Sequence, residues 1–427
     1  MRTTTRHTLG RPVGLLATGA LLTGCGVLPG GNGDVRTLEV WMMNHSAGEE
    51  FIDRVVNDFE SEHEGVEVRV TVQEWGGIGE KVTEALLTGE GPDVIEVGNT
   101  QVAQYVDVGG VRDLTNQVVD LEGDDWVPGL AEPGRVYGHQ YGIPFYAANR
   151  VVIYRTDLFE EAGITEPPAD REEWLEATRL LDEPSGQQGI YLPGQNWYVL
   201  AGFVWDEGGE LALESGGQWR GALDTPEAAR AMEFYADLHE LGDGPRDADE
   251  ANPPHEEVFA SGRVAQIIST PGSARTILEA NPALEGKIGF FPVPGPDADT
   301  PGAVFTGGSN LIITEASEHG RLAYDFVKTL TGDHWQTELA RSMSLVPNRT
   351  TLADAVSEDP GTAAMTEGAR NGRATPQSPR WGMVEADNPI KTYQSAVLGG
   401  ADPAVAGREA SERITEMLSG LGTDGIG

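Results

Sequence analysis

Short apolar runs alternate with longer amphipathic stretches in the first quarter of the chain. Residues 38–41 (Leu-Glu-Val-Trp) form an apolar run, and residues 66–72 place a valine at every second position, so both segments predict strands. Between them, apolar residues at helical spacing predict a helix that Ser46 and Glu49 begin with a capping box.

A helix ending at Gly89 and a short apolar strand over 93–97 complete a β-α-β-α-β order. This order predicts a parallel, doubly wound α/β sheet. Ligands of such sheets bind beyond the carboxyl ends of the strands. Polar and aromatic residues follow the three predicted strands: Trp41, Asn44 and His45, then Glu74 and Trp75, then Asn99 and Thr100.

The remainder of the chain repeats the same element types in a less regular order. Asp170 predicts a helix start with Glu173 as its capping-box partner, and Thr225-Pro226 predicts another. Residues 263–268 predict a strand, and residues 317–330 and 402–418 predict amphipathic helices. The order of elements favours an α/β protein, and the length of the chain predicts more than one domain.

Cys25 is the only cysteine of the 427 residues, and it follows an export signal. Three arginines (Arg2, Arg6, Arg11) precede an apolar run over 13–22 that is too short to span a bilayer. Leu22-Thr23-Gly24-Cys25 resembles the bacterial lipobox, in which the cysteine is lipidated after cleavage. We therefore expect a signal peptide over 1–24 and a lipidated Cys25 with a flexible spacer to residue 35. The protein would be anchored at the extracytoplasmic face of the cell membrane, which it contacts only through the lipid.

The charge balance excludes one class of partner. With 68 acidic and 29 basic residues, the net charge is −39. Such a surface repels phosphate backbones, which argues against nucleic-acid binding.

Catalytic and phosphate-binding motifs are missing from the sequence. Residues 75–79 are rich in glycine but lack dinucleotide-binding spacing, and residues 307–311 lack the final glycine of a nucleophile elbow. Acidic residues around 239–257 lack EF-hand spacing, so a solvated loop is favoured over a cation site. No carboxylate pair stands out for glycoside hydrolysis. We expect no enzyme, no cofactor and no metal.

Tryptophans in loop-like contexts suggest sugar binding. Trp197, Trp205 and Trp381 stand beside polar residues or glycine and proline. Aromatic faces stack on the apolar faces of pyranose rings, while carboxylates, amides and arginines bind the hydroxyls. For each of these tryptophans a core position is equally compatible with the sequence, whereas Trp126, Trp174, Trp219 and Trp335 are expected to be structural.

Several segments in a characteristic order resemble the extracellular solute-binding proteins of sugar ABC importers, which are related to maltodextrin-binding proteins. The segments that carry the resemblance are 38–41, 87–94, 141–146, 151–159, 259–265, 307–311 and 345–349. The resemblance implies two α/β lobes, each a sheet flanked by helices, joined by crossing segments near 144–149, 303–308 and 345–347. It places the N-lobe at 36–146 plus 307–345 and the C-lobe at 147–305 plus 346–427.

The resemblance also implies the ligand-binding residues. They would be Asn44, His45, Glu74, Asn99, Tyr146, Trp197, Trp205, Gly307, Gly308 and Ser309, with Arg349 and Trp381 closing from the far side. Many relatives carry an aromatic residue after the glycine pair, where this chain has Ser309-Asn310. Trp381 or Trp205 would then replace that stacking partner.

The implied function is capture of a sugar, expected to be a di- or oligosaccharide, by a monomer that delivers it to the permease subunits of an ABC importer. Two alternatives stay open at this point. One is binding of another solute, such as a polyol, a glycerol phosphate or a peptide; the acidic balance disfavours phosphorylated ligands. The other is a secreted glycoside hydrolase.

Overall fold

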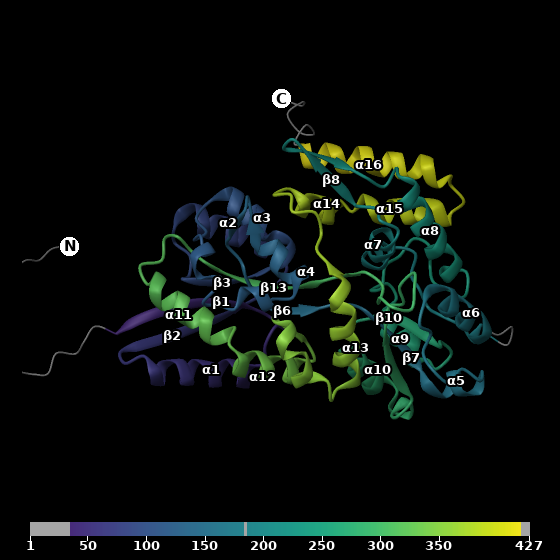
Figure 1. Ribbon diagram of the computed structural model, residues 1–427, viewed down its shortest axis with the longest axis horizontal. Helices are drawn as coiled ribbons and strands as arrows, with labels where there is room; N and C mark the ends of the chain where they lie inside the picture. The colour runs from purple at the N-terminus through teal and green to yellow at the C-terminus, as the bar shows by residue number, and fades with distance from the viewer. Residues whose placement is uncertain (1–34, 183–185, 420–427) are drawn as a thin grey trace, which may run out of the picture. The chain divides into compact units, whose positions relative to one another are not determined.

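The computed structural model describes residues 35–182 and 186–419. The predicted signal peptide, Cys25 and the spacer up to residue 34 lie outside the described residues. From Arg36 onward the chain forms one compact unit. Two sheets organise this unit, and we call the parts built around them the N-lobe and the C-lobe (Figure 1).

A six-stranded mixed sheet forms the centre of the N-lobe, in the order β14-β6-β13-β3-β1-β2. The strands are β1 Arg36–Met43, β2 Val66–Gln73, β3 Val94–Gly98, β6 Ile143–Ala148, β13 Gly307–Ile313 and β14 Val346–Pro347. The first three strands are parallel, as predicted, but β13 runs antiparallel to both β3 and β6. The carboxyl ends of β1, β2, β3 and β6 therefore lie at one edge of the sheet.

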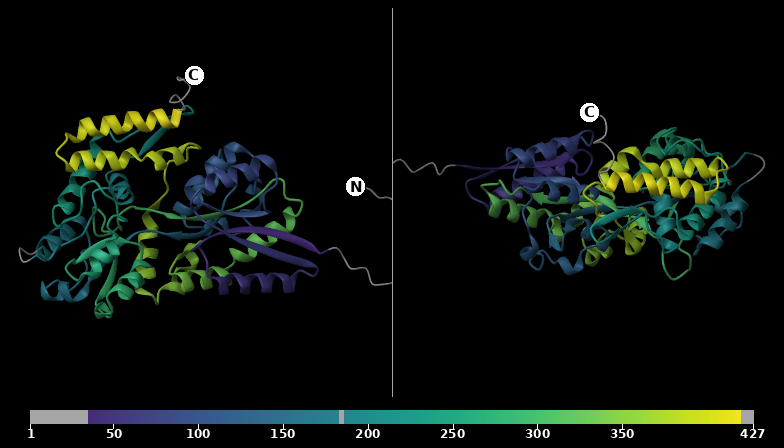
Figure 2. Two further views of the ribbon diagram at one scale, coloured as in Figure 1. Left: turned by 180° about the vertical axis from the view of Figure 1, so that it is seen from behind. Right: turned by 90° about the horizontal axis from the view of Figure 1, so that it is seen from above.

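Helices cover both faces of this sheet (Figures 1 and 2). They are α1 Glu49–Glu62, α2 Ile78–Thr88, α3 Val102–Val108, α4 Pro128–Ala131, α11 Gly320–Leu330 and α12 Asp333–Met343. On one face α1, α11 and α12 share a core in which Phe59 meets Phe326 edge to face at 5.1 Å. On the other face α2 and α3 pack in a second core, which includes Val82 and Tyr105.

A three-stranded antiparallel sheet, β10-β7-β11, forms the centre of the C-lobe. Its strands are β7 Val151–Arg155, β10 Gln266–Ser269 and β11 Ile288–Pro292. The helices of this lobe are α5 Thr156–Glu161, α6 Arg171–Leu181, α7 Trp197–Asp206, α8 Pro226–His239, α9 His255–Ala260, α10 Ser273–Ala280, α13 Pro360–Gly368, α14 Trp381–Asp387, α15 Pro389–Leu398 and α16 Pro403–Ser419. The core of α6, α7, α8, α15 and α16 lies on one side of this sheet, and α9, α10 and α13 contribute to a separate core.

Short strand pairs complete the structure. They are β4 Arg135–Val136 with β5 His139–Gln140, β8 Ala212–Ser215 with β9 Gln218–Gly221, and β12 Val304–Phe305 with β15 Gly372–Arg373. The chain passes between the two sheets where β6 leads into β7 and where β12 leads into β13. These passages match the first two predicted crossings. The lobe boundaries themselves stay a prediction, and β14, at the third predicted crossing, pairs with β6 of the N-lobe sheet.

The helix starts show where local sequence signals decide the structure. Asp170 accepts a hydrogen bond from the Glu173 backbone N–H, and Thr225 accepts one from Ala228, so both predicted caps are confirmed. The capping box at Ser46 is wrong. The N-cap of α1 is Gly48, and the Ser46 hydroxyl lies 2.9 Å from the hydroxyl of Tyr146 instead. Ser46 thus bonds to Tyr146, a residue distant in sequence, instead of capping the helix next to it.

Candidate functional site

Polar and aromatic side chains meet where β1 and β2 end. Asn44 donates hydrogen bonds from Nδ2 to both carboxylate oxygens of Glu74, at 3.1 and 3.3 Å. The indole N–H of Trp75 donates to the carbonyl oxygen of Asn44 at 3.1 Å, which ties the two strand ends together. Trp75 is 41 % exposed although it is held in place by this bond. A flat ring and a carboxylate–amide pair therefore face solvent side by side.

The Trp75 ring extends over the end of β3. Its Cζ3 atom lies 3.5 Å from the place where a Cβ on Gly98 would stand, so Gly98 leaves room for the ring. Gly98 leads into the 3-10 turn η1 (Asn99–Gln101). Asn99 is buried and donates from Nδ2 to the carbonyl oxygen of Thr306 at 2.7 Å, which ties β3 to the crossing segment. Thr100 is the half-buried residue next to it.

Tyr146 lies in a buried hydrogen-bond network below this edge. Its hydroxyl contacts the hydroxyls of Ser46 at 2.9 Å and Ser309 at 3.2 Å. The fully buried Glu96 accepts a hydrogen bond from the Met43 backbone N–H at 2.8 Å, and burial raises the pKa of this carboxyl. Burial, followed by the charge of Glu96, raises the pKa of Tyr146. The network joins β1, β3, β6 and β13 and thus stabilises the sheet from inside.

The glycine pair at the start of β13 allows two strands to approach closely. Gly308 has φ +137°, and a Cβ there would overlap the carbonyl oxygen of Tyr146. Gly307 is more tolerant, because a Cβ there would lie 3.2 Å from the Ala148 carbonyl oxygen. Both glycines are half-buried beside the crossing into the C-lobe.

An aromatic cluster forms the opposing surface of the C-lobe. The ring of Tyr198 stacks on Phe305 with centroids 4.7 Å apart and an interplanar angle of 25°. Trp197 packs against Tyr198 with centroids 4.1 Å apart but is only 4 % exposed. Above Tyr198 lies the guanidinium of Arg150, 4.4 Å from the ring centroid, and Arg150 pairs with Glu250 at 2.8 Å.

Glu385 joins the two lobes. Its Oε1 accepts a hydrogen bond from the indole N–H of Trp381 at 3.1 Å, and its Oε2 accepts one from the hydroxyl of Thr100 at 3.3 Å. Burial raises the pKa of Glu385, although both hydrogen bonds oppose the shift. Burial, followed by the charge of Glu385, raises the pKa of Tyr198 to about 12, so this hydroxyl stays protonated at neutral pH.

Two predicted ligand residues lie away from these groups. Trp205, at the other end of α7, is buried under the guanidinium of Arg373, which lies 5.5 Å from its ring centroid. Arg349 is 4 % exposed and forms ion pairs with Glu122 and Asp333 and a hydrogen bond to the Thr331 carbonyl oxygen. Both side chains are engaged in packing or charge pairing where they stand.

We define the interlobe site as the polar strand-end groups of the N-lobe together with the aromatic cluster of the C-lobe, which the Thr100–Glu385 hydrogen bond links. The N-lobe contributes Asn44, Glu74, Trp75 and Thr100, and the C-lobe contributes Arg150, Tyr198, Glu250, Phe305 and Glu385. Trp381 is fully buried in the C-lobe core and supports the site only through its indole N–H to Glu385. The site offers ring faces next to carboxylates, an amide and a guanidinium. Such a set binds a ligand with apolar faces and many hydroxyls.

The structure brings together only some of the predicted residues. Asn44 and Glu74 belong to the interlobe site, and the exposed His45 follows Asn44 with φ +68°. The predicted stacking role of Trp381 does not fit the structure, because its ring is fully buried in the C-lobe core. Asn99, Tyr146, Trp197 and Ser309 are buried beneath it. Sequence reasoning missed Arg150, Tyr198, Glu250, Phe305 and Glu385 as site residues. A signal existed for Glu385, because it stands four residues after Trp381 on one helix face.

Comparison with known proteins identifies the family. The family model for bacterial extracellular solute-binding proteins matches residues 44–337 of the chain. The chain belongs to this family. It is therefore a binding protein rather than an enzyme.

Individual relatives are similar to this chain over almost its whole length. The diacetylchitobiose binding protein DasA of Streptomyces coelicolor is 37 % identical over 384 residues, which cover 90 % of each chain. The sugar-binding protein MalE of Xanthomonas citri superposes with a TM-score of 0.81 at 24 % identity, covering 90 % of this chain and 98 % of that one. A cyclic α-maltosyl-1,6-maltose binding protein from Arthrobacter globiformis gives a TM-score of 0.76 at 20 % identity, with coverage of 90 % and 99 %. These likenesses establish the two-lobed periplasmic-binding-protein fold.

Two properties hold for residues 35–182 and 186–419, the ranges that the structure describes. No helix in these ranges is long and apolar enough to cross a membrane. Within the same ranges no group of three or more His, Cys, Asp or Glu side chains is arranged to hold a metal ion. In the acidic loop, Asp249 is paired with Lys391 at 2.7 Å.

Proposed function

We propose that the protein captures a di- or oligosaccharide at the interlobe site and delivers it to the permease subunits of an ABC importer. The observation that carries this proposal is the half-buried Tyr198 ring, stacked on Phe305 and flanked by the Arg150–Glu250 pair, next to the carboxylate that contacts the N-lobe. A pyranose ring needs this combination of aromatic face and paired polar groups.

Groups from both lobes in one site support a capture mechanism. A ligand that contacts both lobes stabilises the arrangement in which they are close, whereas a ligand of one lobe shifts nothing. In the structure the Thr100–Glu385 hydrogen bond already spans the lobes. A bound sugar would exchange this bond for its own hydroxyls and add the ring contacts.

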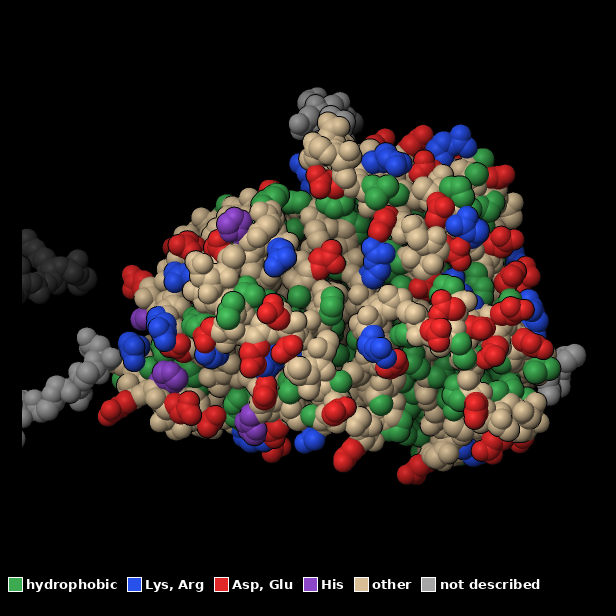
Figure 3. Space-filling view, viewed as in Figure 1, with side chains coloured by type: hydrophobic (Ala, Val, Ile, Leu, Met, Phe, Trp, Pro, Cys, Tyr) green, Lys and Arg blue, Asp and Glu red, His purple; other side chains and the backbone are tan. Residues whose placement is uncertain are grey.

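The identity of the ligand is proposed from the relative DasA. DasA is a diacetylchitobiose binding protein, and 37 % identity over 90 % of both chains makes a related disaccharide the first choice for this chain. The surface is rich in acidic side chains, as the viewed face shows (Figure 3). It would repel phosphorylated sugars and favours a neutral saccharide.

The test is calorimetric titration of the Cys25→Ser protein with diacetylchitobiose, maltose, maltotriose and mannitol. We expect diacetylchitobiose to bind and to be recovered intact. Glu74→Gln and Glu385→Gln should each weaken the binding, while a matched exposed acid on the far end of α16, Glu416→Gln, should leave it unchanged. Absence of binding to every saccharide, or cleavage of any of them, would overturn the proposal.

We also propose that Cys25 carries the lipid anchor that holds the receptor beside its importer. A tether raises the local concentration of the loaded receptor at the permease. In cells, Cys25→Ser should release the protein from the membrane fraction and abolish incorporation of labelled palmitate. The affinity of the released protein for its sugar should not change, and retention on the membrane would contradict the anchor.

A further inference from the structure

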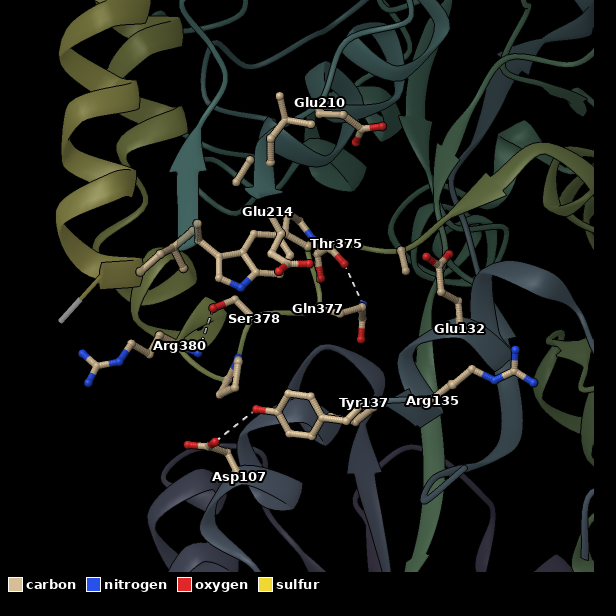
Figure 4. Close-up of a pocket in the computed structure, with 18 of the residues that line it drawn as sticks. Asp107, Glu132, Arg135, Tyr137, Glu210, Glu214, Thr375, Gln377, Ser378 and Arg380 are labelled. Carbon is tan, nitrogen blue, oxygen red and sulfur yellow. Dashed lines mark hydrogen bonds between the residues drawn. The ribbon is translucent and has the colours of Figure 1, made fainter. Parts of the chain in front are cut away.

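A cavity between the lobes shares no lining residue with the interlobe site. Its volume is about 690 Å³, within the range of roughly 300–1,000 Å³ that small-molecule sites occupy. The N-lobe contributes the β4–β5 turn and the end of α3, and the C-lobe contributes the β8–β9 hairpin and residues 373–380 (Figure 4). We call this cavity the rear groove.

Tyr137 occupies an unfavourable backbone conformation at the edge of the rear groove. It is the first residue of the two-residue β4–β5 turn, with φ +52°, and Gly138 follows with φ +83°. Such turns favour Asn, Asp or Gly at both positions. The tyrosine ring is nevertheless 71 % exposed, and its hydroxyl donates to Asp107 at 3.2 Å. A strained, exposed and oriented aromatic ring points to a ligand.

The opposite wall supplies matching groups. Trp219 of β9 lines the groove and is half-buried. Thr375 also lines the groove, is 2 % exposed, and its hydroxyl oxygen has no hydrogen-bond partner among the described residues. Gln377 lies next to it and donates to the Thr375 carbonyl oxygen at 2.6 Å (Figure 4). An unsatisfied buried hydroxyl is costly unless a ligand or water completes it.

The charges of the groove favour a neutral ligand. Four carboxylates line it (Asp107, Glu132, Glu210, Glu214) against three arginines (Arg135, Arg373, Arg380). One of these arginines is already neutralised, because Arg373 pairs with Glu210 at 2.7 Å. Anions are therefore disfavoured, and rings on two walls with polar groups between them suit the alternating faces and hydroxyls of a sugar.

We propose that the rear groove is a second saccharide site, in which Tyr137 and Trp219 hold a pyranose ring between the lobes. The site is independent of the interlobe site. Residues 373–380, which line it, lead directly into α14, the helix that carries Trp381 and Glu385.

The test is saturation-transfer NMR with diacetylchitobiose, maltose and xylobiose at millimolar concentration, on protein whose interlobe site is weakened by Tyr198→Ala. We expect transfer to at least one of the three sugars. Adding Tyr137→Asn or Trp219→Ala should weaken that binding about tenfold, the effect of losing one ring contact. Adding Tyr137→Phe keeps the ring and should retain binding.

Folding does not obscure the result. Asn suits the turn conformation of residue 137, so Tyr137→Asn should melt no lower than its parent even if Trp219→Ala does. Transfer to none of the three sugars in the Tyr198→Ala protein would overturn the proposal. The proposal would also be overturned if saturation transfer to a sugar is seen but neither Tyr137→Asn nor Trp219→Ala reduces it. The test still holds if the interlobe site binds no sugar, because each groove variant is compared only with its Tyr198→Ala parent.

Discussion

Tyr146 and Tyr198 both lie beside a crossing between the lobes, yet they have opposite surroundings. Tyr146 is 9 % exposed, and its hydroxyl is bound to Ser46 and Ser309 inside the N-lobe. The ring of Tyr198 contacts Phe305 and the guanidinium of Arg150 and is half-buried. The first tyrosine can hold the sheet together, and the second can hold a ligand. A residue type suited to binding is thus no evidence of a binding role until its environment is known.

The largest expected effect tests the strand contact on which the Tyr146 region depends. Gly308→Ala forces a side chain against the Tyr146 carbonyl oxygen at φ +137°. It should lower the free energy of unfolding by about 3 kcal/mol, measured by urea denaturation. Gly76→Ala is the control, because Gly76 has ordinary φ and nothing within 4 Å of its Cβ position. Equal stability of both variants would show that β6 and β13 are not held this closely.

The second effect concerns Tyr198. Tyr198→Ala removes the ring face and should weaken sugar binding by about 2 kcal/mol, roughly thirtyfold, in calorimetric titration. Tyr198→Phe retains the ring and should lose much less. Unchanged affinity of Tyr198→Ala would exclude this residue from the ligand site, and Tyr198 would then have a structural role as Tyr146 does.

The third effect concerns Tyr146, which we expect to affect the stability of the protein and not its affinity for sugar. Tyr146→Phe leaves the hydroxyls of Ser46 and Ser309 without one buried partner. It should lower the free energy of unfolding by about 1–2 kcal/mol, by urea denaturation, and leave the sugar affinity within about twofold. A loss of affinity with unchanged stability would make Tyr146 a ligand residue after all.

The smallest effect is the pH dependence of the interlobe contact. Burial raises the pKa of Glu385, so the folded protein binds this proton more tightly than the unfolded chain does. The protonated Glu385 therefore stabilises the folded protein fully at acid pH. This stabilisation falls as the pH rises from the usual pKa range of a glutamate through the raised pKa of Glu385. Glu385→Gln removes the charge, so it should raise the melting temperature at about pH 7 and leave it unchanged at about pH 4. A variant that melts lower than the parent at both values would contradict this assignment.

Local and repetitive signals made most of the elements predictable. The alternating valines of β2, the helix end at Gly89 and the caps at Asp170 and Thr225 all depend on residues close in sequence. The mixed order of the N-lobe sheet was not predictable in this way. Its last three strands come from residues far apart along the chain, and β13 inserts between β3 and β6.

The interlobe site was predictable at the strand ends and much less so in the C-lobe. Asn44 and Glu74 were found because parallel strands bring their carboxyl ends to one edge. Trp197 was among the predicted ligand residues and Tyr198 was not, but the start of α7 buries Trp197 and leaves its neighbour half-buried. Arg150 and Glu250 are far apart in sequence and meet only through the fold.

The sequence by itself determined the alternation of strands and helices, the acidic surface and the chemistry available at the strand ends, because each depends on composition or short-range spacing. Its order of motifs also pointed to the solute-binding family. Only the tertiary structure decided which aromatic rings are buried, that Ser46 bonds to Tyr146 instead of capping α1, and that Glu385 reaches Thr100 across the lobes. Burial and long-range hydrogen bonds arise from packing between distant segments, and no local pattern encodes them.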